Sequence, residues 1–274
     1  MKAGEVVEAV EKNCPDFIKF LGTGGARFVV SQQMRASGGI WLSFQGTQVH
    51  IDPGPGALVR CLSAHPRLDP SQLDGIILTH RHLDHASDVN IMIEAMTKGG
   101  YRRKGTLFAP PDAMETDPVV LQYVRAYLAN IETLREGGSY TLGSIRFSTP
   151  VRHVHLAETY GLKFSFSEKV LSLIADTLFF EELASHYHQS DCLIINVVRL
   201  EATPSEKIIY HLCIEDAQRI MNEIRPRKVL LTHFGSMMLQ AGPELLAEEL
   251  SQKSGIEVIA CCDGLTLSME ELFA

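Results

Sequence analysis

The sequence predicts an α/β protein in which two β-sheets are packed between layers of helices. Apolar runs of strand length cluster in each half of the 274 residues, and helical stretches intervene. No linker, low-complexity tract or charge block divides the chain, so a single domain over residues 1–274 is expected. The segments 77–80 and 230–233 are both apolar runs that end in Thr-His, which indicates two similar halves that each deliver a histidine from a strand end.

The first half is expected to begin with strands that are joined by turns. Glycine and proline punctuate the apolar runs at 22–25 and 52–56, and Gly99-Gly100 stops a helical stretch. The predicted strands are 17–21, 40–44, 48–51 and 75–78, and the predicted helices are 57–64, 89–98 and about 118–134.

The second half returns to strands and then alternates them with helices. The predicted strands are 144–148, 160–166, 170–175, 192–198, 229–232, 258–260 and 266–269, and the predicted helices are 178–185, 214–223 and 243–253.

The composition is that of a globular protein with a sizeable core. Hydrophobic residues make up 45% and charged residues 21%, and the formal net charge of −8 argues against a general polyanion-binding surface. No apolar run approaches membrane-spanning length, and residues 1–14 form an acidic amphipathic stretch rather than a signal peptide. The six cysteines are scattered, several of them within apolar runs, so they are interpreted as reduced core residues. A soluble, cytoplasmic protein is expected.

Residues 79–85, Thr-His-Arg-His-Leu-Asp-His, hold a dense group of metal-binding side chains directly after an apolar strand. His80 and His82 point the same way if the chain stays extended, so they can share one ion. Asp84 and His85 then turn away and can serve a second ion. This donor set suits Zn²⁺, and Mn²⁺ or Fe²⁺ can also use it.

Two further donors end apolar runs in the second half of the chain. His233 follows the strand 229–232, and Asp176 follows the run 171–175. A buried carboxylate is costly unless it is paired or bound to metal, and its two oxygens can bridge two ions. The alternatives are a histidine that caps the following turn and an aspartate that is the N-cap of a helix over residues 177–183.

The remaining nitrogen donor has two candidates, His153 and His155. They are two residues apart in an extended segment and face the same way, so their spacing does not separate them. His186 and His188 form a similar pair, but they lie in a polar connection and are interpreted as surface residues.

The order of these motifs resembles the metallo-β-lactamase-fold hydrolases. The segment 79–85 is similar to their HxHxDH signature, and the segments 20–24, 175–177 and 231–234 most resemble the ribonuclease Z and cyclic-phosphodiesterase branch. In that branch a histidine stands six residues before a strand-opening glycine, as His155 stands before Gly161. The resemblance implies a four-layer αββα sandwich with two mixed sheets flanked by helices.

The resemblance also implies a dinuclear site. One ion would be held by His80, His82 and His155. The second would be held by Asp84, His85 and His233, with Asp176 bridging both ions beside a shared hydroxide.

A further histidine, His211, begins a helical stretch. The resembling branch has a histidine at the matching place, which is not a metal ligand but contacts the scissile phosphate and can protonate the leaving oxygen. By the same resemblance Asp84 helps to orient the nucleophile. The alternative for His211 is a surface histidine at a helix N-terminus.

The expected function is that of a metal-dependent hydrolase. A hydroxide activated by two divalent ions, Zn²⁺ before Mn²⁺ or Fe²⁺, would attack a small cyclic or linear phosphodiester. The alternatives are hydrolysis of a carboxylic ester, lactone or thioester, tRNA 3′-end processing, and a metal-containing binding protein without catalysis.

Small substrates are favoured over nucleic acid. Residues 191–197 stand where ribonuclease Z has a His-Glu-Ala-Thr stretch, no Gly/Pro-rich insertion resembles its tRNA-gripping arm, and the chain is acidic. The expected partner is therefore a small-molecule phosphodiester or ester. No membrane partner is expected, and a homodimer is compatible with the branch.

Overall fold

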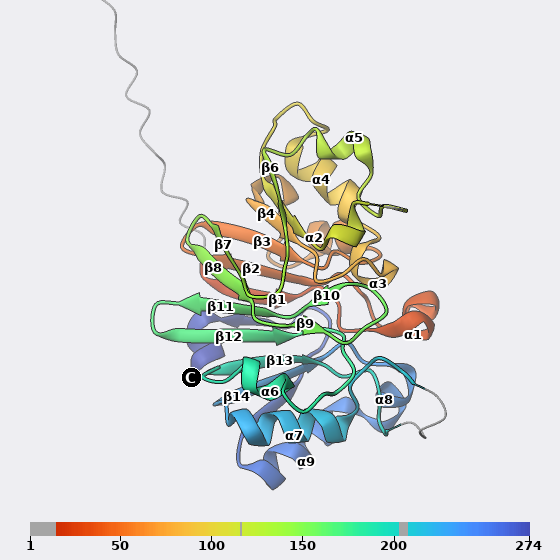
Figure 1. Cartoon of the computed structure of the whole chain (residues 1–274), viewed down its shortest axis with the longest axis vertical. Helices are drawn as coiled ribbons and strands as arrows, with labels where there is room; N and C mark the ends of the chain where they lie inside the picture. The colour runs from red at the N-terminus through yellow and green to blue at the C-terminus, as the bar shows by residue number, and fades with distance from the viewer. Residues whose placement is uncertain (1–14, 116, 203–207) are drawn as a thin grey trace, which may run out of the picture.

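The computed structural model describes residues 15–115, 117–202 and 208–274. The acidic stretch predicted at residues 1–14, which includes Cys14, lies outside the described residues. Within the described ranges the chain forms two seven-stranded sheets and one two-stranded sheet. Figure 1 shows the two large sheets stacked face to face, with helices on both outer sides.

The first sheet is mixed, and the strand nearest the C-terminus joins it by pairing antiparallel with β1. Its antiparallel part includes the β2–β3 hairpin, and from β3 onwards neighbouring strands are parallel. In order across the sheet the strands are β16 (Thr266–Ser268), β1 (Phe17–Phe20), β2 (Ile40–Phe44), β3 (Thr47–Ile51), β4 (Gly75–Ile77), β5 (Thr106–Ala109) and β6 (Asn130–Thr133).

The second sheet has the same mixed character. Its parallel strands β13 and β14 are buried at every position, which explains why they read as continuous apolar runs. In order across the sheet the strands are β15 (Glu257–Ala260), β14 (Lys228–Thr232), β13 (Cys192–Asn196), β12 (Lys169–Ile174), β11 (Leu162–Phe166), β8 (Ile145–Thr149) and β7 (Gly138–Leu142). The small sheet pairs β9 (Arg152–His153) with β10 (Thr159–Tyr160).

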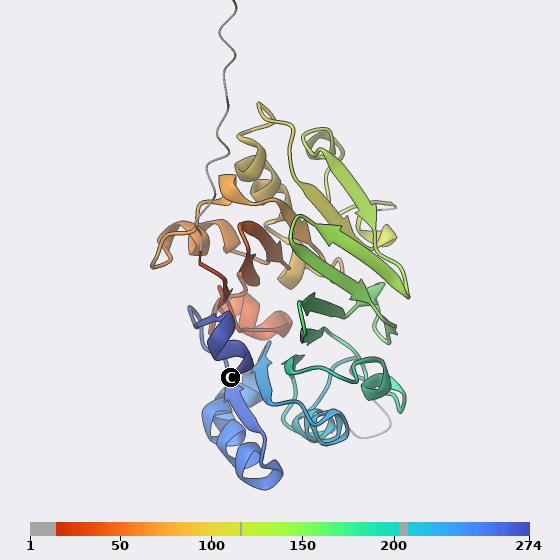
Figure 2. The ribbon, with the colours of Figure 1, turned by 90° about the vertical axis from the view of Figure 1, so that its left-hand side faces the viewer.

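Helices cover the outer faces of both sheets, whereas the short C-terminal helix packs against the cluster between the sheets. The helices are α1 (Ala26–Gln32), α2 (Ala57–Ser63), α3 (Leu83–Ala86), α4 (Val89–Thr97), α5 (Gln122–Arg125), α6 (Leu183–His186), α7 (Ile214–Ile224), α8 (Ser236–Ala241), α9 (Pro243–Ser254) and α10 (Met269–Phe273). In Figure 2 the orange and yellow segments of the first half lie in the upper part of the view, and most of the blue C-terminal part lies below them.

Three apolar clusters hold the layers together. The central one packs residues of the first sheet, such as Phe20, against residues of the second, such as Phe164. A second cluster packs the outer face of the first sheet against α4, and a third packs the second sheet against α7 and α9. The predicted αββα sandwich is therefore confirmed.

Two helix predictions are wrong. The expected helix at 118–134 is only one helical turn, α5, followed by the strand β6, which pairs in parallel with β5. The expected helix at 178–185 is reduced to α6, which begins at Leu183. The predicted strand 160–166 is interrupted at Gly161, which separates β10 from β11.

The sequence prediction omitted several short elements. They include the helices α1, α3, α8 and α10 and the strands β5, β6, β7 and β9. Four described cysteines are buried as expected, whereas Cys262 is exposed. In the described part of the chain, no helix combines the length and the apolar character that crossing a membrane requires.

Candidate metal centre

The predicted donors meet where strands of both sheets end. His80 and His82 follow β4 of the first sheet, whereas Asp176 and His233 follow β12 and β14 of the second. His155 comes from the connection between β9 and β10. Because parallel strands end at one edge of their sheet, packing the two sheets together brings these loops to a single place.

The first group of donors consists of His80, His82 and His155, whose ligand atoms lie within 4.8 Å of one another. His155 Nε2 is 3.0 Å from His82 Nδ1, and His155 Nδ1 donates to the carbonyl of Tyr210 at 2.8 Å. That bond leaves the lone pair of His155 on Nε2, facing the other donors. Burial lowers the pKa of His155 to about 4, so the ring is neutral near pH 7, as a metal ligand must be.

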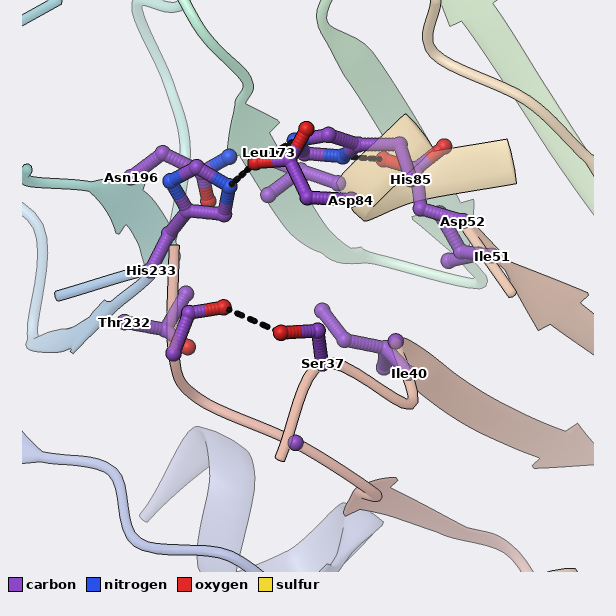
Figure 3. Close-up of a pocket in the computed structure, with 13 residues that line it drawn as sticks. Ser37, Ile40, Ile51, Asp52, Asp84, His85, Leu173, Asn196, Thr232 and His233 are labelled. Carbon is purple, nitrogen blue, oxygen red and sulfur yellow. Dashed lines mark hydrogen bonds and ion pairs between the residues drawn. The ribbon is translucent and has the colours of Figure 1, made fainter. Parts of the chain in front are cut away.

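The second group consists of Asp84, His85, Asp176 and His233, again with ligand atoms within 4.8 Å. His233 Nε2 is 3.4 Å from Asp84 Oδ2, and Figure 3 shows the two side chains facing each other. Asp176 Oδ2 is 3.5 Å from His85 Nε2 and 3.8 Å from His80 Nε2, which belongs to the first group. Asp176 therefore lies between the two groups.

Several of these atoms are buried without a hydrogen-bond partner among the described residues. They are His80 Nε2, His85 Nε2, Asp176 Oδ2 and both ring nitrogens of His233. Leaving such atoms unpaired costs free energy, so their convergence calls for a shared partner. Imidazole nitrogens and carboxylate oxygens are the donors that Zn²⁺, Mn²⁺ and Fe²⁺ take, so the residues present fit divalent metal ions.

The charge balance of the second group also favours a cation. Burial by itself lowers the pKa of His85, but the carboxylates of Asp84, Asp52 and Asp176 outweigh it and hold that pKa well above its usual value. The cluster thus stabilises positive charge at this point, and a bound metal ion would supply that charge in place of the proton.

Two polar residues that the sequence prediction missed hold the donors in place. Asp52 Oδ2 accepts from His85 Nδ1 at 2.9 Å and from the hydroxyl of Thr79 at 2.6 Å. Asn196 Nδ2 donates to Asp176 Oδ1 at 2.9 Å. Asp52 comes directly after β3, as Asp176 comes after β12, so the same strand-end pattern could have identified it.

The two remaining histidines of the prediction differ in their contacts with the donors. His153 is buried in β9 and shares a 2.8 Å hydrogen bond with the hydroxyl of Tyr187, and it belongs to neither group. His211 also joins neither group, but its Nδ1 is 3.4 Å from Asp176 Oδ2. The structure therefore places His155 rather than His153 with the donors, and it places His211 beside them.

The backbone around the second group includes two residues with positive φ and a glycine packed directly against the ring of His233. His233 has a φ of 62° and Asp52 a φ of 52°, which are left-handed conformations that non-glycine residues adopt rarely. A Cβ atom at Gly25 would overlap the ring of His233. The next residue, Ala26, donates its backbone N–H to Asp84 Oδ2 at 3.1 Å, so the start of α1 closes one side of the site.

The other predicted surface histidines stay outside the site. His188 is exposed and His186 is half-buried in α6. The helix that would have made Asp176 an N-cap does not form at Thr177, which removes that alternative for Asp176.

Comparisons with known proteins agree on the family to which the chain is similar. The model of the β-lactamase superfamily domain matches residues 47–234. An uncharacterized protein of Methanocaldococcus jannaschii is 30% identical over 262 residues, which cover 92% of this chain and 94% of that protein. A ribonuclease Z of Nanoarchaeum equitans is 24% identical over 270 residues, covering 79% of this chain and 82% of that protein.

A solved structure has the same fold. The metallo-β-lactamase fold protein YhfI from Bacillus subtilis matches with a TM-score of 0.75 at 18% identity, covering 93% of this chain and 99% of that one.

Proposed function

Since this chain belongs to the metallo-β-lactamase-fold hydrolase family, in its ribonuclease Z-like branch, we propose that it hydrolyses a small phosphodiester with water at a dinuclear metal site. The observation that carries the proposal is the pair of donor groups with Asp176 between them. One group supplies three imidazoles, and the other supplies two imidazoles and two carboxylates. This is a donor set for two adjacent ions rather than for one.

Residues of both sheets would hold the ions, Zn²⁺ in first place. The first ion would take His80, His82 and His155, and the second Asp84, His85 and His233, with Asp176 shared between them. When bound, two divalent ions lower the pKa of a water molecule and stabilise negative charge that develops on the ester.

The protein's own side chains would control the protons and the orientation. Asp84 is fixed by the N–H of Ala26, so its carboxylate can hold the attacking water in line. His211 is partly exposed, with 18% of its side chain accessible, and it lies beside Asp176. From there it can give a proton to the leaving oxygen, which makes it the general acid of the proposal.

Charge and polarity support a small organic ester as the substrate. The net charge of −8 opposes a long polyanion. Leu83 and Leu156, which adjoin donor residues, are 70% and 73% exposed, so apolar surface flanks the donors. A phosphodiester that carries an uncharged organic group suits such surroundings better than a nucleic acid does.

The test is hydrolysis of bis-p-nitrophenyl phosphate by the protein loaded with Zn²⁺ or Mn²⁺. We expect turnover in the wild type and a loss of at least about a hundredfold in Asp84→Ala, because the positioned carboxylate is removed. Asp69→Ala, which removes an exposed carboxylate outside the donor groups, serves as the matched control and should retain wild-type turnover.

Absence of turnover with every metal, despite two bound ions, would contradict the hydrolase proposal. Turnover of p-nitrophenyl acetate without turnover of the phosphodiester would instead transfer the assignment to carboxylic esters.

A further inference from the structure

A second cavity, of about 260 Å³, lies between β1 and the end of α2. Its lining includes the side chains of Lys19, Arg60 and His65, and Gly264 of the loop before β16. None of its lining residues belongs to the pocket beside His85 and His233. The cavity is therefore a separate place on the molecule, and it is lined by cationic side chains in a protein whose net charge is −8.

Lys19 is the unusual member of this lining, because it is a lysine on a buried strand. Only 5% of the residue is exposed, since it points from β1 toward the helix layer, while its neighbours Ile18 and Phe20 point into the core between the sheets. Its ammonium group donates to the hydroxyl of Thr266 at 2.6 Å and to the carbonyl of Gly264 at 3.1 Å. A third contact, to the carbonyl of His65, is long at 3.4 Å.

These partners satisfy hydrogen bonds but leave the charge of Lys19 without a counter-ion. Within the part of the chain that the structure describes, no carboxylate oxygen lies within 4.0 Å of its ammonium group. A buried charge is costly unless an opposite charge accompanies it. Burial accordingly lowers the pKa of Lys19, and no neighbouring carboxylate opposes that shift.

Lys228 is a comparable buried lysine of the same protein, and it has a carboxylate partner. It is 4% exposed on β14, also donates to a backbone carbonyl, that of Glu271, and has the carboxylate of Glu257 at 3.3 Å. The two lysines thus share burial and carbonyl contacts. They differ in that Lys228 has a carboxylate from its own chain, whereas Lys19 faces a cavity.

Arg60 adds a second cation to the cavity, and it is only loosely paired. Its guanidinium is 3.7 Å from Asp263 Oδ2, which is longer than a hydrogen bond. That oxygen already accepts from the N–H of Ala36 at 2.7 Å, and the other accepts from Thr23. Asp263 is therefore a loose partner of Arg60 alone, and among the described residues the positive charge of Lys19 still has no carboxylate within 4.0 Å.

From this geometry we infer that the cavity between β1 and α2 binds a small organic or inorganic anion through a carboxylate or phosphate group. An oxygen of that group would take the place of the distant His65 carbonyl at the Lys19 ammonium group, and a second oxygen would accept from Arg60. Both contacts are charge-assisted, and guanidinium and ammonium groups bind either kind of anion. The remaining volume leaves room for a neutral body beside Leu21 and Ala64.

The inference is tested on the metal-loaded protein by NMR of the lysine ε-methylene groups during titration with sodium phosphate and, separately, with sodium acetate. The Lys19 signal is identified by its absence in Lys19→Met. We expect it to shift and to saturate with at least one of the two anions, and to do so equally in Asp84→Ala, because the donors of the metal centre are not involved. Saturation by phosphate alone assigns the phosphate class, and saturation by acetate as well extends the site to carboxylates.

Lys19→Arg keeps a cation at the buried position and identifies the same signal if Lys19→Met does not fold, and a further variant tests the second cation of the cavity. Arg60 is half-exposed, so Arg60→Gln should fold normally and should raise the saturation midpoint by about threefold to tenfold. Arg67→Gln changes an exposed arginine outside the cavity and should leave the midpoint unchanged. A Lys19 signal that drifts without saturation for both anions, or a midpoint that Arg60→Gln does not move, would overturn the inference.

Discussion

Asp52 fixes the orientation of His85 at the scale of a single residue. Its carboxylate accepts from the ring of His85 and, through both oxygens, from the backbone and hydroxyl of Thr79. In Asp52→Asn an amide NH₂ replaces one carboxylate oxygen. A donor group then faces a donor of Thr79 or His85 that the oxygen had accepted from. We expect the affinity for metal to fall by about tenfold to a hundredfold without loss of the fold, as for other groups that orient metal-binding histidines.

The measurement is the metal content of wild type and Asp52→Asn after equilibration in a chelator-buffered series of Zn²⁺ concentrations, with circular dichroism as the check of folding. Asp69→Asn, at an exposed position outside the donor groups, is the control. Equal metal content in Asp52→Asn and in the wild type at every concentration would show that His85 does not need Asp52.

His153 and His155 should respond differently to removal. His155→Ala removes one of the three nitrogen donors of the first group, so the protein should lose one of the two proposed ions. His153→Ala should retain both ions but lower the free energy of unfolding by about 1–3 kcal/mol, because the buried hydroxyl of Tyr187 loses its partner. Metal stoichiometry and urea denaturation separate the two outcomes, and loss of an ion from His153→Ala alone would reverse the assignment.

Residue patterns identified candidate donors that the structure brings together, but they missed the polar residues that contact those donors. His80, Asp176 and His233 could be found because each follows an apolar run, and the structure brings them together. His153 and His155 share one extended segment, so the residues alone did not separate them. The choice of His155 came from the resembling branch, in which the histidine stands six residues before a glycine. Asn196 lies within the strand β13, where nothing in the local sequence indicates that its amide reaches Asp176.

At the scale of elements, the start of α1 closes the site, and Gly25 permits the close approach. A side chain there would overlap the ring of His233. Gly25→Ala should therefore displace His233 and lower kcat by about tenfold to a hundredfold, since small displacements at a reacting centre have effects of that size. Ser31→Ala, an exposed change on the same helix, should leave kcat unchanged.

Turnover of the phosphodiester and circular dichroism on the same preparations check this prediction. Wild-type kcat in Gly25→Ala would mean that His233 can shift without consequence.

Element prediction failed where local sequence and tertiary pairing disagree. Residues 118–134 contain enough helix-forming side chains to suggest one long helix, yet the second part pairs with β5 as the edge strand β6. Ile131 and Thr133 are β-branched and suit a strand, but a strand of this length is set by its neighbour rather than by its own propensity. Helices with a strong apolar face, such as α7, were predicted within one residue of their observed ends.

At the scale of the whole molecule, the site exists only because the two sheets pack against each other. His80, His82, Asp84 and His85 follow the first sheet, whereas Asp176 and His233 follow the second. The apolar core that includes Phe20, Phe164 and Leu230 holds the sheets at the distance that brings these loops together. Metal binding and the packing of the two sheets should therefore depend on each other, because the unfolded chain does not present the donors together.

Removing the metal should consequently destabilise the whole fold. In the metal-free protein one ring nitrogen each of His80 and His85 and one oxygen of Asp176 are buried without a partner. These unpaired atoms raise the free energy of the native state but not that of the unfolded state, where water binds them. With free metal at about a thousand times its dissociation constant, the loss on chelation is about 4 kcal/mol in the free energy of unfolding. Urea denaturation with and without EDTA, followed by restoration with Zn²⁺, measures it. Asp176→Ala removes the residue that lies between both groups. In this variant EDTA should lower the free energy of unfolding by only a small fraction of the wild-type loss. Identical urea midpoints for metal-loaded and chelated wild type would show that the sheets pack independently of the ions.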